Sequence, residues 1–186
     1  MDKPNIVFIT TDQQRGDCVG YGGHPCVRTP HLDMLAHEAV VFEQAYSDCP
    51  VCIPARTTMI TAIQSHHYGK PSFAAEYRID RERSKFLGSL MTKAGYQTIL
   101  VGKSHWHTDP TFRAGFETWL PWSRLNRKRQ AWSARDDNLS GIGMNDFSPT
   151  LSPYPRELNT TVWAVEESLD QLEDRDRTRP FFLWTS

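Results

Sequence analysis

The chain has 186 residues, of which 39% are hydrophobic and 11% aromatic, enough apolar material for one globular domain with a sizeable core. Its formal net charge of −1 argues against a general nucleic-acid binder, whose surface would be strongly basic. No apolar stretch approaches the roughly 20 residues that a membrane-spanning helix needs, and the first residues lack the layout of a signal peptide. We therefore expect a cytoplasmic protein that binds neither nucleic acid nor membrane.

The first predicted element is a strand at residues 5–10, which holds the unbroken apolar run 6–9. Such a run is typical of a parallel strand that is covered on both faces. Asp12 follows directly, at the position where open α/β sheets place ligands. A turn or cap residue is the alternative interpretation of Asp12, and the local pattern alone favours it.

A helix is predicted to begin at Thr29 and Pro30, which suit an N-cap and a first helical position. Its apolar residues recur at helical spacing and are Leu32, Leu35, Ala36, Ala39 and Val40. We expect this helix to lay one face on the sheet.

The stretch Cys52-Ile53-Pro54-Ala55-Arg56 indicates the mouth of a second helix. Pro54 suits the first helical turn, so Cys52 is expected just before a helix N-terminus, where free N–H groups and the dipole favour an anion. Arg56 adds a planar fork of donors that fits a tetrahedral oxyanion. Apolar residues predict the buried face of this helix, namely Met59, Ile60 and Ile63. The combination indicates a site for a sulfuryl or phosphoryl group.

The four cysteines are Cys18, Cys26, Cys49 and Cys52, and in a reducing compartment we expect free thiols. Cys49 and Cys52 form a C-x-x-C, so a redox pair or half of a zinc site is an alternative. No second C-x-x-C exists to complete a four-cysteine site.

A third helix is predicted from Phe86 to a stop at Gly95, followed by a buried strand at residues 97–101. Lys103 and His105 lie on the loop that leaves this strand, as Asp12 does after the first one. Polar residues that follow parallel strands meet at one edge of the sheet. Taken alone, a lysine and a histidine in a loop are more often surface residues.

Regular periodicity fades over residues 108–158, which we interpret as a long, loop-rich insert. Its basic run, residues 124–129, either meets an anionic substrate or is a solvated surface. A last helix is predicted from the spacing of Val162, Val165, Leu169 and Leu172, and residues 181–184 predict a third buried strand. The fold class is therefore α/β, a mostly parallel sheet with helices on both faces.

Four phrases resemble the sulfatase family, which is part of the alkaline-phosphatase-like superfamily. Cys-x-Pro-Ala-Arg at residues 52–56 is similar to the family signature, and Gly-Lys-Ser-His at 102–105 resembles its Gly-Lys-x-His. The phrases at 29–36 and 115–117 resemble its Thr-Pro-Asn-Leu-Asp-x-Leu-Ala and Gly-Phe-Asp/Glu. The resemblance covers essentially the whole chain, and implies that residues 1–186 are only the N-terminal portion of a family catalytic domain.

Three positions depart from the family pattern. Ala62 stands where a glycine is usual, and Ile53 is larger than the common occupant, but neither change removes a functional group. Thr11 stands where many members have a second aspartate beside Asp12, which leaves the identity of the metal open.

The resemblance implies hydrolysis of sulfate esters through formylglycine, formed from Cys52 by a maturating enzyme. It implies a divalent metal, calcium before magnesium or manganese, with Asp12 and Cys52 among its ligands. Arg56 would stabilise the formylglycine, Lys103 would bind a sulfate oxygen, and His105 would orient the gem-diol or take its proton. The substrate would be a sulfated small molecule or glycan.

Two alternatives stay open. The same scaffold could hydrolyse phosphonate or phosphate esters, because both centres are tetrahedral and anionic. The chain could instead be a truncated, inert domain, which as a homo-oligomer would cover an open sheet edge.

Overall fold

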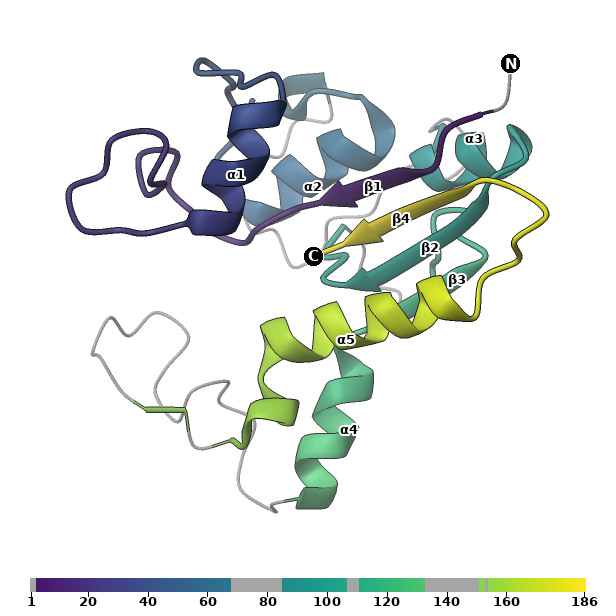
Figure 1. Cartoon of the computed structure of the whole chain (residues 1–186). Helices are drawn as coiled ribbons and strands as arrows, with labels where there is room; N and C mark the ends of the chain where they lie inside the picture. The colour runs from purple at the N-terminus through teal and green to yellow at the C-terminus, as the bar shows by residue number, and fades with distance from the viewer. Residues whose placement is uncertain (1–2, 68–84, 107–110, 133–150, 153) are drawn as a thin grey trace.

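The structure is a computed structural model that describes residues 3–67, 85–106, 111–132, 151–152 and 154–186 (Figure 1). The described strands are β1 (Ile6–Ile9), β2 (Gln97–Gly102), β3 (Thr118–Pro121) and β4 (Phe181–Thr185). The described α-helices are α1 (Pro30–Glu38), α2 (Cys52–Thr61), α3 (Leu87–Lys93), α4 (Ser123–Trp132) and α5 (Thr160–Glu173). Two short 3₁₀ turns are η1 (Ser65–His67) and η2 (Arg156–Leu158).

The four strands form one parallel sheet in the order β1-β4-β2-β3. Because all strands run the same way, the loops after β1 and β2 and the residue after β4, Ser186, lie at the same edge of the sheet, the one formed by the carboxyl ends of the strands (Figure 1). The register pairs Ile9 with Thr185 and Val101 with Thr185, so the ends of these three strands lie level with one another. This edge carries the predicted site residues.

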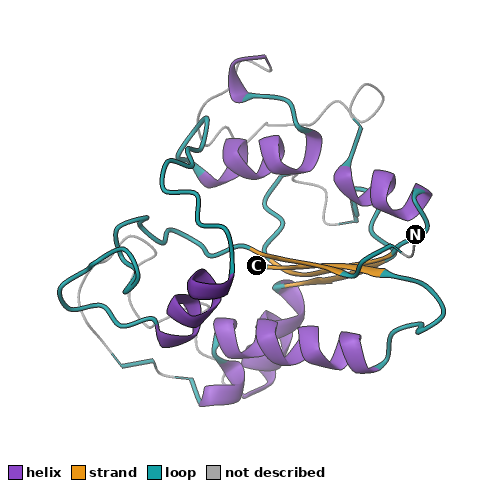
Figure 2. Ribbon diagram, turned by 45° about the horizontal axis from the view of Figure 1, so that its top comes forward, coloured by secondary structure: helices purple, strands orange, loops and turns teal. Residues whose placement is uncertain are grey.

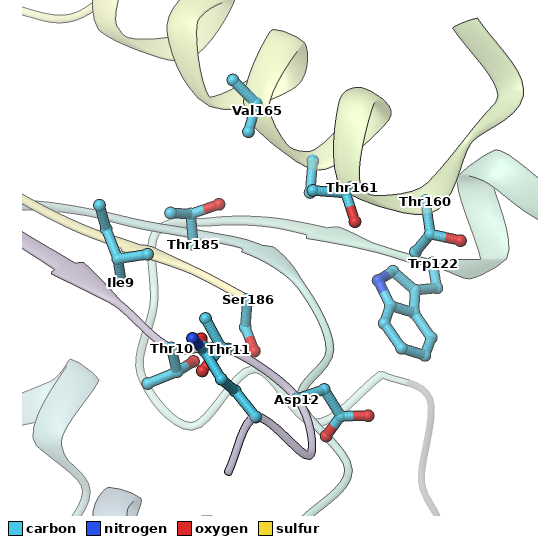
Figure 3. Close-up of a pocket in the computed structure, with 12 residues that line it drawn as sticks. Ile9, Thr10, Thr11, Asp12, Trp122, Thr160, Thr161, Val165, Thr185 and Ser186 are labelled. Carbon is cyan, nitrogen blue, oxygen red and sulfur yellow. The ribbon is translucent and has the colours of Figure 1, made fainter. Parts of the chain in front are cut away.

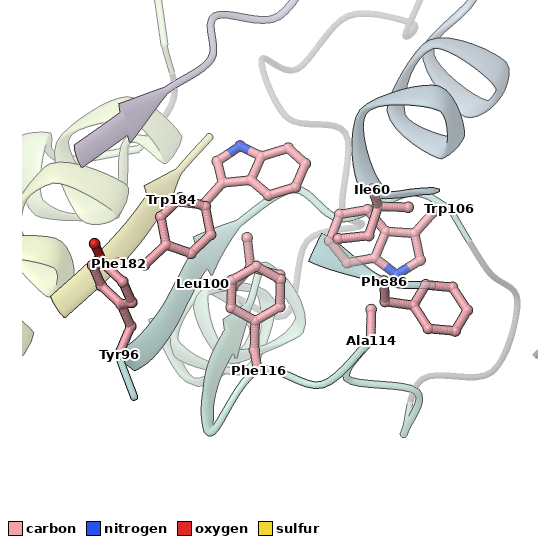
Figure 4. Close-up of a cluster of buried hydrophobic side chains, with 9 residues drawn as sticks. All are labelled: Ile60, Phe86, Tyr96, Leu100, Trp106, Ala114, Phe116, Phe182 and Trp184. Atoms are coloured by element: carbon pink, nitrogen blue, oxygen red, sulfur yellow. The ribbon is translucent and has the colours of Figure 1, made fainter. Parts of the chain in front are cut away.

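Helices cover both faces of the sheet (Figure 2). Alternate residues of β2 and β4 point into two separate cores, as the two-residue period of a strand requires. One core packs under α2 and α3 and consists of Ile60, Phe86, Tyr96, Leu100, Trp106, Ala114, Phe116, Phe182 and Trp184 (Figure 4). The other packs under α4 and α5 and consists of Ile99, Val101, Leu120, Leu125, Leu158, Trp163, Ala164, Phe181 and Leu183. The predicted α/β class is confirmed.

The prediction that the first strand is covered on both faces is wrong. Ile6 and Phe8 pack against the first core, whereas Val7 is 50% and Ile9 68% exposed. β1 is one of the two outer strands of the sheet, and no described helix covers its second face. An apolar run indicates a buried strand, yet the run alone does not show which residues of the chain cover it.

The prediction that the first helix packs on the sheet is also wrong, because none of the residues of α1, all of them described, is buried. Hydrogen bonds to a preceding turn hold the start of the helix instead. Asp33 accepts from the Tyr21 amide at 2.9 Å and from the Thr29 hydroxyl at 2.7 Å. Thr29 also accepts from the Gly20 amide at 2.8 Å.

The buried faces of two other helices differ from those predicted. In α2, Ile60 is buried but Met59 is exposed. In α5, Val165 and Leu169 are exposed, and the side that faces the sheet carries Trp163, Ala164 and Ser168. The Ser168 hydroxyl bonds the Thr185 hydroxyl at 2.9 Å, so a polar contact occupies a place that hydrophobic spacing could not reveal.

The loop-rich interpretation of residues 108–158 missed two regular elements, β3 and α4. β3 is only four residues long, and the mean composition of α4 is strongly polar, so neither has a clear periodic signal. Residues 133–150 lie outside the described part. Among the residues described, no helix combines the length and apolar composition that crossing a membrane requires.

Candidate active site

Cys52 is the first residue of α2 and is half-buried. The helix therefore begins one residue earlier than predicted, because Cys52 was expected just before its N-terminus. Val51 is the N-cap, and its carbonyl accepts from the Ala55 amide at 3.0 Å. Pro54 is buried in the first turn, where its missing N–H leaves no bond unmade. The helix ends at Ala62 with φ 57°, a left-handed conformation that explains why a glycine is usual there.

Arg56 joins α2 to the ends of two strands. Its Nη1 donates to the Lys103 carbonyl at 2.8 Å, and its Nη2 donates to Ser186 Oγ at 2.7 Å. The residue is 4% exposed. Burial lowers the pKa of the Arg56 guanidinium, while the nearby charges of Asp12 and Cys52 act in the opposite direction. Arg56 therefore fixes the geometry of the edge besides supplying charge.

The glycine of the Gly-Lys-Ser-His phrase is required by a close backbone approach. Gly102 ends β2 with φ +96°, and a Cβ there would lie 1.8 Å from the Ser186 carbonyl oxygen. That oxygen accepts from the Lys103 amide at 3.1 Å, which fixes where the lysine leaves the strand. Only glycine fits this turn without moving β4.

The structure brings Asp12, Arg56 and Lys103 together. Lys103 Nζ lies 2.7 Å from Asp12 Oδ2, and Arg56 Nη2 lies 3.7 Å from Asp12 Oδ1. The three residues come from the loop after β1, from α2 and from the loop after β2. This is the juxtaposition that parallel strands predict.

His105 lies on the same loop with φ +53°, an uncommon conformation for a non-glycine residue. Its pKa is lowered, first by burial and then by the positive charges of Lys103 and Arg56, while Asp12 opposes the shift. A neutral imidazole can accept a proton at neutral pH. His107, which the sequence leaves without a role, lies outside the described residues.

A cavity of about 350 Å³ opens beside Asp12, between the ends of β1 and β4 and the first turns of α5 (Figure 3). Its lining is mostly hydroxyl-bearing and apolar and includes Thr10, Thr11, Trp122, Thr160, Thr161, Val165 and Ser186. Lys103 Nζ lies 5.5 Å from the centre of the Trp122 ring. Sequence reasoning missed both Trp122 and Ser186, and no motif marks either of them.

The described residues do not by themselves fit a divalent metal. Calcium takes 6–8 oxygen ligands and magnesium six, from carboxylates, carbonyls and waters. The described part of the chain contains no group of three or more His, Cys, Asp or Glu side chains placed for a metal ion. Asp12 supplies one carboxylate, and two cationic side chains already neutralise it.

None of the four cysteines, all of them in the described part of the chain, is in a disulfide, so Cys49 and Cys52 are not bonded to each other in this structure. Among the described residues, no third His, Cys, Asp or Glu side chain lies where it could bind a zinc ion together with Cys49 and Cys52.

The substrate-binding hypothesis for the basic run is wrong for Arg129, which is 3% exposed. Its Nε and Nη2 donate to the Leu158 carbonyl at 2.9 and 2.7 Å, and its guanidinium stacks on Tyr154. Arg129 therefore attaches α4 to η2. For the exposed Arg124 and Arg127 the hypothesis stays a prediction.

Comparison of the sequence with known proteins identifies relatives with established names. The chain is 33% identical to an arylsulfatase of Clostridium perfringens, over 97% of this chain and 42% of that protein. It is 29% identical to the human N-acetylgalactosamine-6-sulfatase, over 97% of this chain and 38% of that protein. The chain thus spans about two fifths of the length of these relatives.

Solved structures show the same fold at lower identity. The phosphonate monoester hydrolase of Agrobacterium radiobacter superposes with a TM-score of 0.76 at 23% identity, over 98% of this chain and 40% of that one. A structure solved with its substrate D-glucosamine-2-N,6-O-disulfate gives 0.68 at 22% identity, over 98% of this chain and 34% of that one. The family model named Sulfatase matches residues 4–186, and the protein therefore belongs to the sulfatase family.

Proposed function

We propose that residues 1–186 form the N-terminal portion of a catalytic domain that hydrolyses sulfate esters. The observation that carries the proposal is the convergence of Arg56 and Lys103 at the edge of the sheet where α2 begins with Cys52. Two cations and a helix N-terminus are suited to hold a tetrahedral oxyanion. Sulfatase relatives that match 97% of the chain support the reaction class.

In this proposal Cys52 is converted to formylglycine by a maturating enzyme, and the hydrated aldehyde supplies the nucleophile. Arg56 and Lys103 bind and orient the sulfate oxygens. His105 accepts a proton, because its lowered pKa keeps the imidazole neutral. Removal of one preorganised charge stabiliser of this kind costs on the order of 10²–10³ in rate.

Asp12 is proposed to give one carboxylate to a divalent cation, with calcium as the first candidate. The cation's other ligands would have to come from residues beyond those described. A metal titration of the 186-residue chain tests whether these residues alone complete a metal site. Tight stoichiometric binding would contradict the division of the ligands and also the inert-fragment alternative.

The substrate is proposed to be a sulfated glycan or a sulfated small molecule. The relatives named for N-acetylgalactosamine-6-sulfate and the structure solved with a sulfated glucosamine favour the glycan. The hydroxyls and the indole that line the cavity beside Asp12 could contact such a ring.

Hydrolysis of phosphonate or phosphate esters is the second candidate. Two phosphonate monoester hydrolases superpose with TM-scores of 0.76 and 0.73. Their identity of 23% supports a shared fold and no more. Negative charge and tetrahedral geometry are common to both classes of ester, so Arg56 and Lys103 suit either one.

The test is a panel of aryl sulfate and phosphonate monoester substrates, offered to a longer protein that continues past Ser186. We expect sulfate hydrolysis to dominate and Cys52→Ala to abolish it. Cys26→Ala is the matched control, because Cys26 is an exposed free thiol that has no part in the proposed site. Turnover that survives Cys52→Ala would defeat the assignment, and a preference for phosphonates would favour the second candidate.

A further inference from the structure

A second cavity, of about 310 Å³, lies where the chain enters β1 and β4, next to Asn5 and Pro180. Because β4 is five residues long, this end of the sheet is roughly 17 Å from the edge that carries the candidate active site (Figure 1). Cations line the cavity from two segments of the chain, and they are Lys3, Arg175, Arg177 and Arg179. We call it the basic cavity.

Only one of these four cations is paired with carboxylates. Arg179 lies 3.0 and 2.8 Å from the two carboxylate oxygens of Glu117, and its Nε lies 3.3 Å from Asp176. Among the residues described, no carboxylate forms an ion pair with the other three cations. Four cations and two carboxylates therefore give the basic cavity a net charge of +2, which favours an anionic ligand.

The contacts that Lys3 and Arg175 already make do not neutralise them. Lys3 donates to the Ala94 carbonyl and Arg175 to the Leu172 carbonyl, at the C-terminal ends of α3 and α5. A carbonyl carries no net charge, and an ammonium has three N–H donors and a guanidinium five. Both side chains can therefore offer further N–H groups to a ligand, as can the exposed Arg177.

Hydrogen bonds hold the loop that carries Arg177 in place. Asp176 Oδ1 accepts from the Thr178 amide at 2.9 Å and from the Thr178 hydroxyl at 2.6 Å. The Asp176 amide donates to Gln97 Oε1 at 2.9 Å, which attaches the loop to the start of β2. Arg177 lies between these two anchored residues, so its backbone loses little freedom when a ligand binds.

We propose that the basic cavity is a second oxyanion site, in which Lys3, Arg175 and Arg177 bind a sulfate group away from the candidate active site. The oxygens of a tetrahedral oxyanion accept N–H groups from several directions, so such a group suits cations that come from two segments. Membership of the sulfatase family is the reason to choose sulfate as the probe. The site uses none of the residues of the proposed function.

The experiment is an NMR titration of the 186-residue chain with sodium sulfate, at low ionic strength because screening weakens such contacts. We expect a saturable shift of the Thr178 amide signal, which reports on the basic cavity alone. Arg177→Gln and Lys3→Gln should each weaken the affinity measured at Thr178 by about threefold, the effect of one partly exposed ion pair. The double variant should weaken it by about tenfold. A Thr178 signal that does not respond to sulfate would overturn the proposal.

Two control variants separate this site from other effects of charge. Arg124→Gln removes an exposed arginine of α4 and changes the net charge as Arg177→Gln does, and we expect it to leave the affinity unchanged. Equal losses in these two variants would show a general charge effect and overturn the proposal. Lys103→Met alters the candidate active site and should leave the response of Thr178 intact. Loss of that response in Lys103→Met would also overturn the second site.

Free sulfate and a sulfate group on a polysaccharide share this chemistry, and two further probes distinguish them. Dextran sulfate that binds at least about tenfold more tightly per sulfate group than sodium sulfate would indicate chain-borne groups, because several groups of one polymer can bind in turn. Equal affinities would indicate the free ion. The same shift with unsulfated dextran would overturn recognition of an anion.

The proposed function is judged separately, by turnover in the longer protein. Arg177→Gln should leave the hydrolysis of a small aryl sulfate unchanged, because Arg177 lies at the opposite edge of the sheet. Sulfate binding at Thr178 without sulfatase turnover would remove the proposed function and leave the second site in place. Turnover without sulfate binding at Thr178 would do the reverse.

Discussion

Arg56→Met should destabilise the chain by about 3 kcal/mol. The substitution removes two hydrogen bonds from a buried guanidinium, at 2.8 Å to the Lys103 carbonyl and at 2.7 Å to Ser186 Oγ. Hydrogen bonds to charged groups contribute about 1.5–3 kcal/mol each. We take the lower end, because burying the arginine charge has its own cost, which methionine avoids.

The assay is urea unfolding followed by tryptophan fluorescence. With a slope of about 2 kcal/mol per molar urea, the midpoint should fall by about 1.5 M. Arg124→Met is the matched control, since Arg124 is exposed on α4 and its loss should change stability by less than about 0.5 kcal/mol. An Arg56→Met midpoint equal to that of the control would refute the idea that this arginine holds the sheet edge together.

Three further predictions concern backbone and charge. Gly102→Ala should lower the free energy of unfolding in urea by about 3 kcal/mol, because its Cβ would lie 1.8 Å from the Ser186 carbonyl oxygen. Gly23→Ala is the control, since Gly23 has φ +83° but open space around it, and it should cost about 1 kcal/mol. Equal losses in the two variants would disprove the close approach at Gly102. Ala62→Gly should raise the unfolding free energy by about 0.5–1 kcal/mol by relieving a left-handed alanine, and a loss of stability would count against that conformation. NMR titration should place the pKa of His105 below its ordinary value of 6.5, with Lys103→Met raising it; a value above 6.5 would contradict the burial of the ring.

The lowered pKa of His105 also sets the direction of a pH effect on stability. The folded state binds the proton on His105 less readily than the unfolded state does. The free energy of unfolding is therefore highest above the pKa of the unfolded state, about 6.5, and declines as the pH falls from there towards the pKa of the folded state. His105→Gln should lack this decline. The measurement is the free energy of unfolding of both proteins at pH 7.5 and at pH 5.5. An equal decline in the two proteins would argue against the lowered pKa of His105.

The sequence predicts the site better than it predicts what covers the sheet. Apolar runs locate β2 and β4, and polar residues directly after parallel strands must meet at one edge, so Asp12 and Lys103 could be placed together in advance. The phrase around Cys52 likewise locates the start of α2 to within one residue. These predictions succeed because they depend on local pattern and on the geometry of a parallel sheet.

Other features depend on contacts that no local pattern records. Arg56 binds the Lys103 backbone carbonyl and the Ser186 hydroxyl, which lie 47 and 130 residues away. The motif that contains Lys103 gives no sign of this backbone contact, and Ser186 belongs to no motif. Hydrophobic spacing showed that α1 and α5 are amphipathic, yet it could not show which element each would meet. In α5 the true buried face includes Ser168, whose hydroxyl is satisfied by Thr185.

The proposed function depends on Cys52 as the precursor of the nucleophile. The most direct measurement is the mass of the tryptic peptide containing Cys52, from protein produced together with a formylglycine-generating enzyme. We predict a mass lowered by the difference between a CH₂–SH and a CHO group at Cys52, with the exposed Cys26 unchanged as the internal control. A Cys52 that keeps its plain thiol while a reference sulfatase is converted in the same cells would contradict the claim.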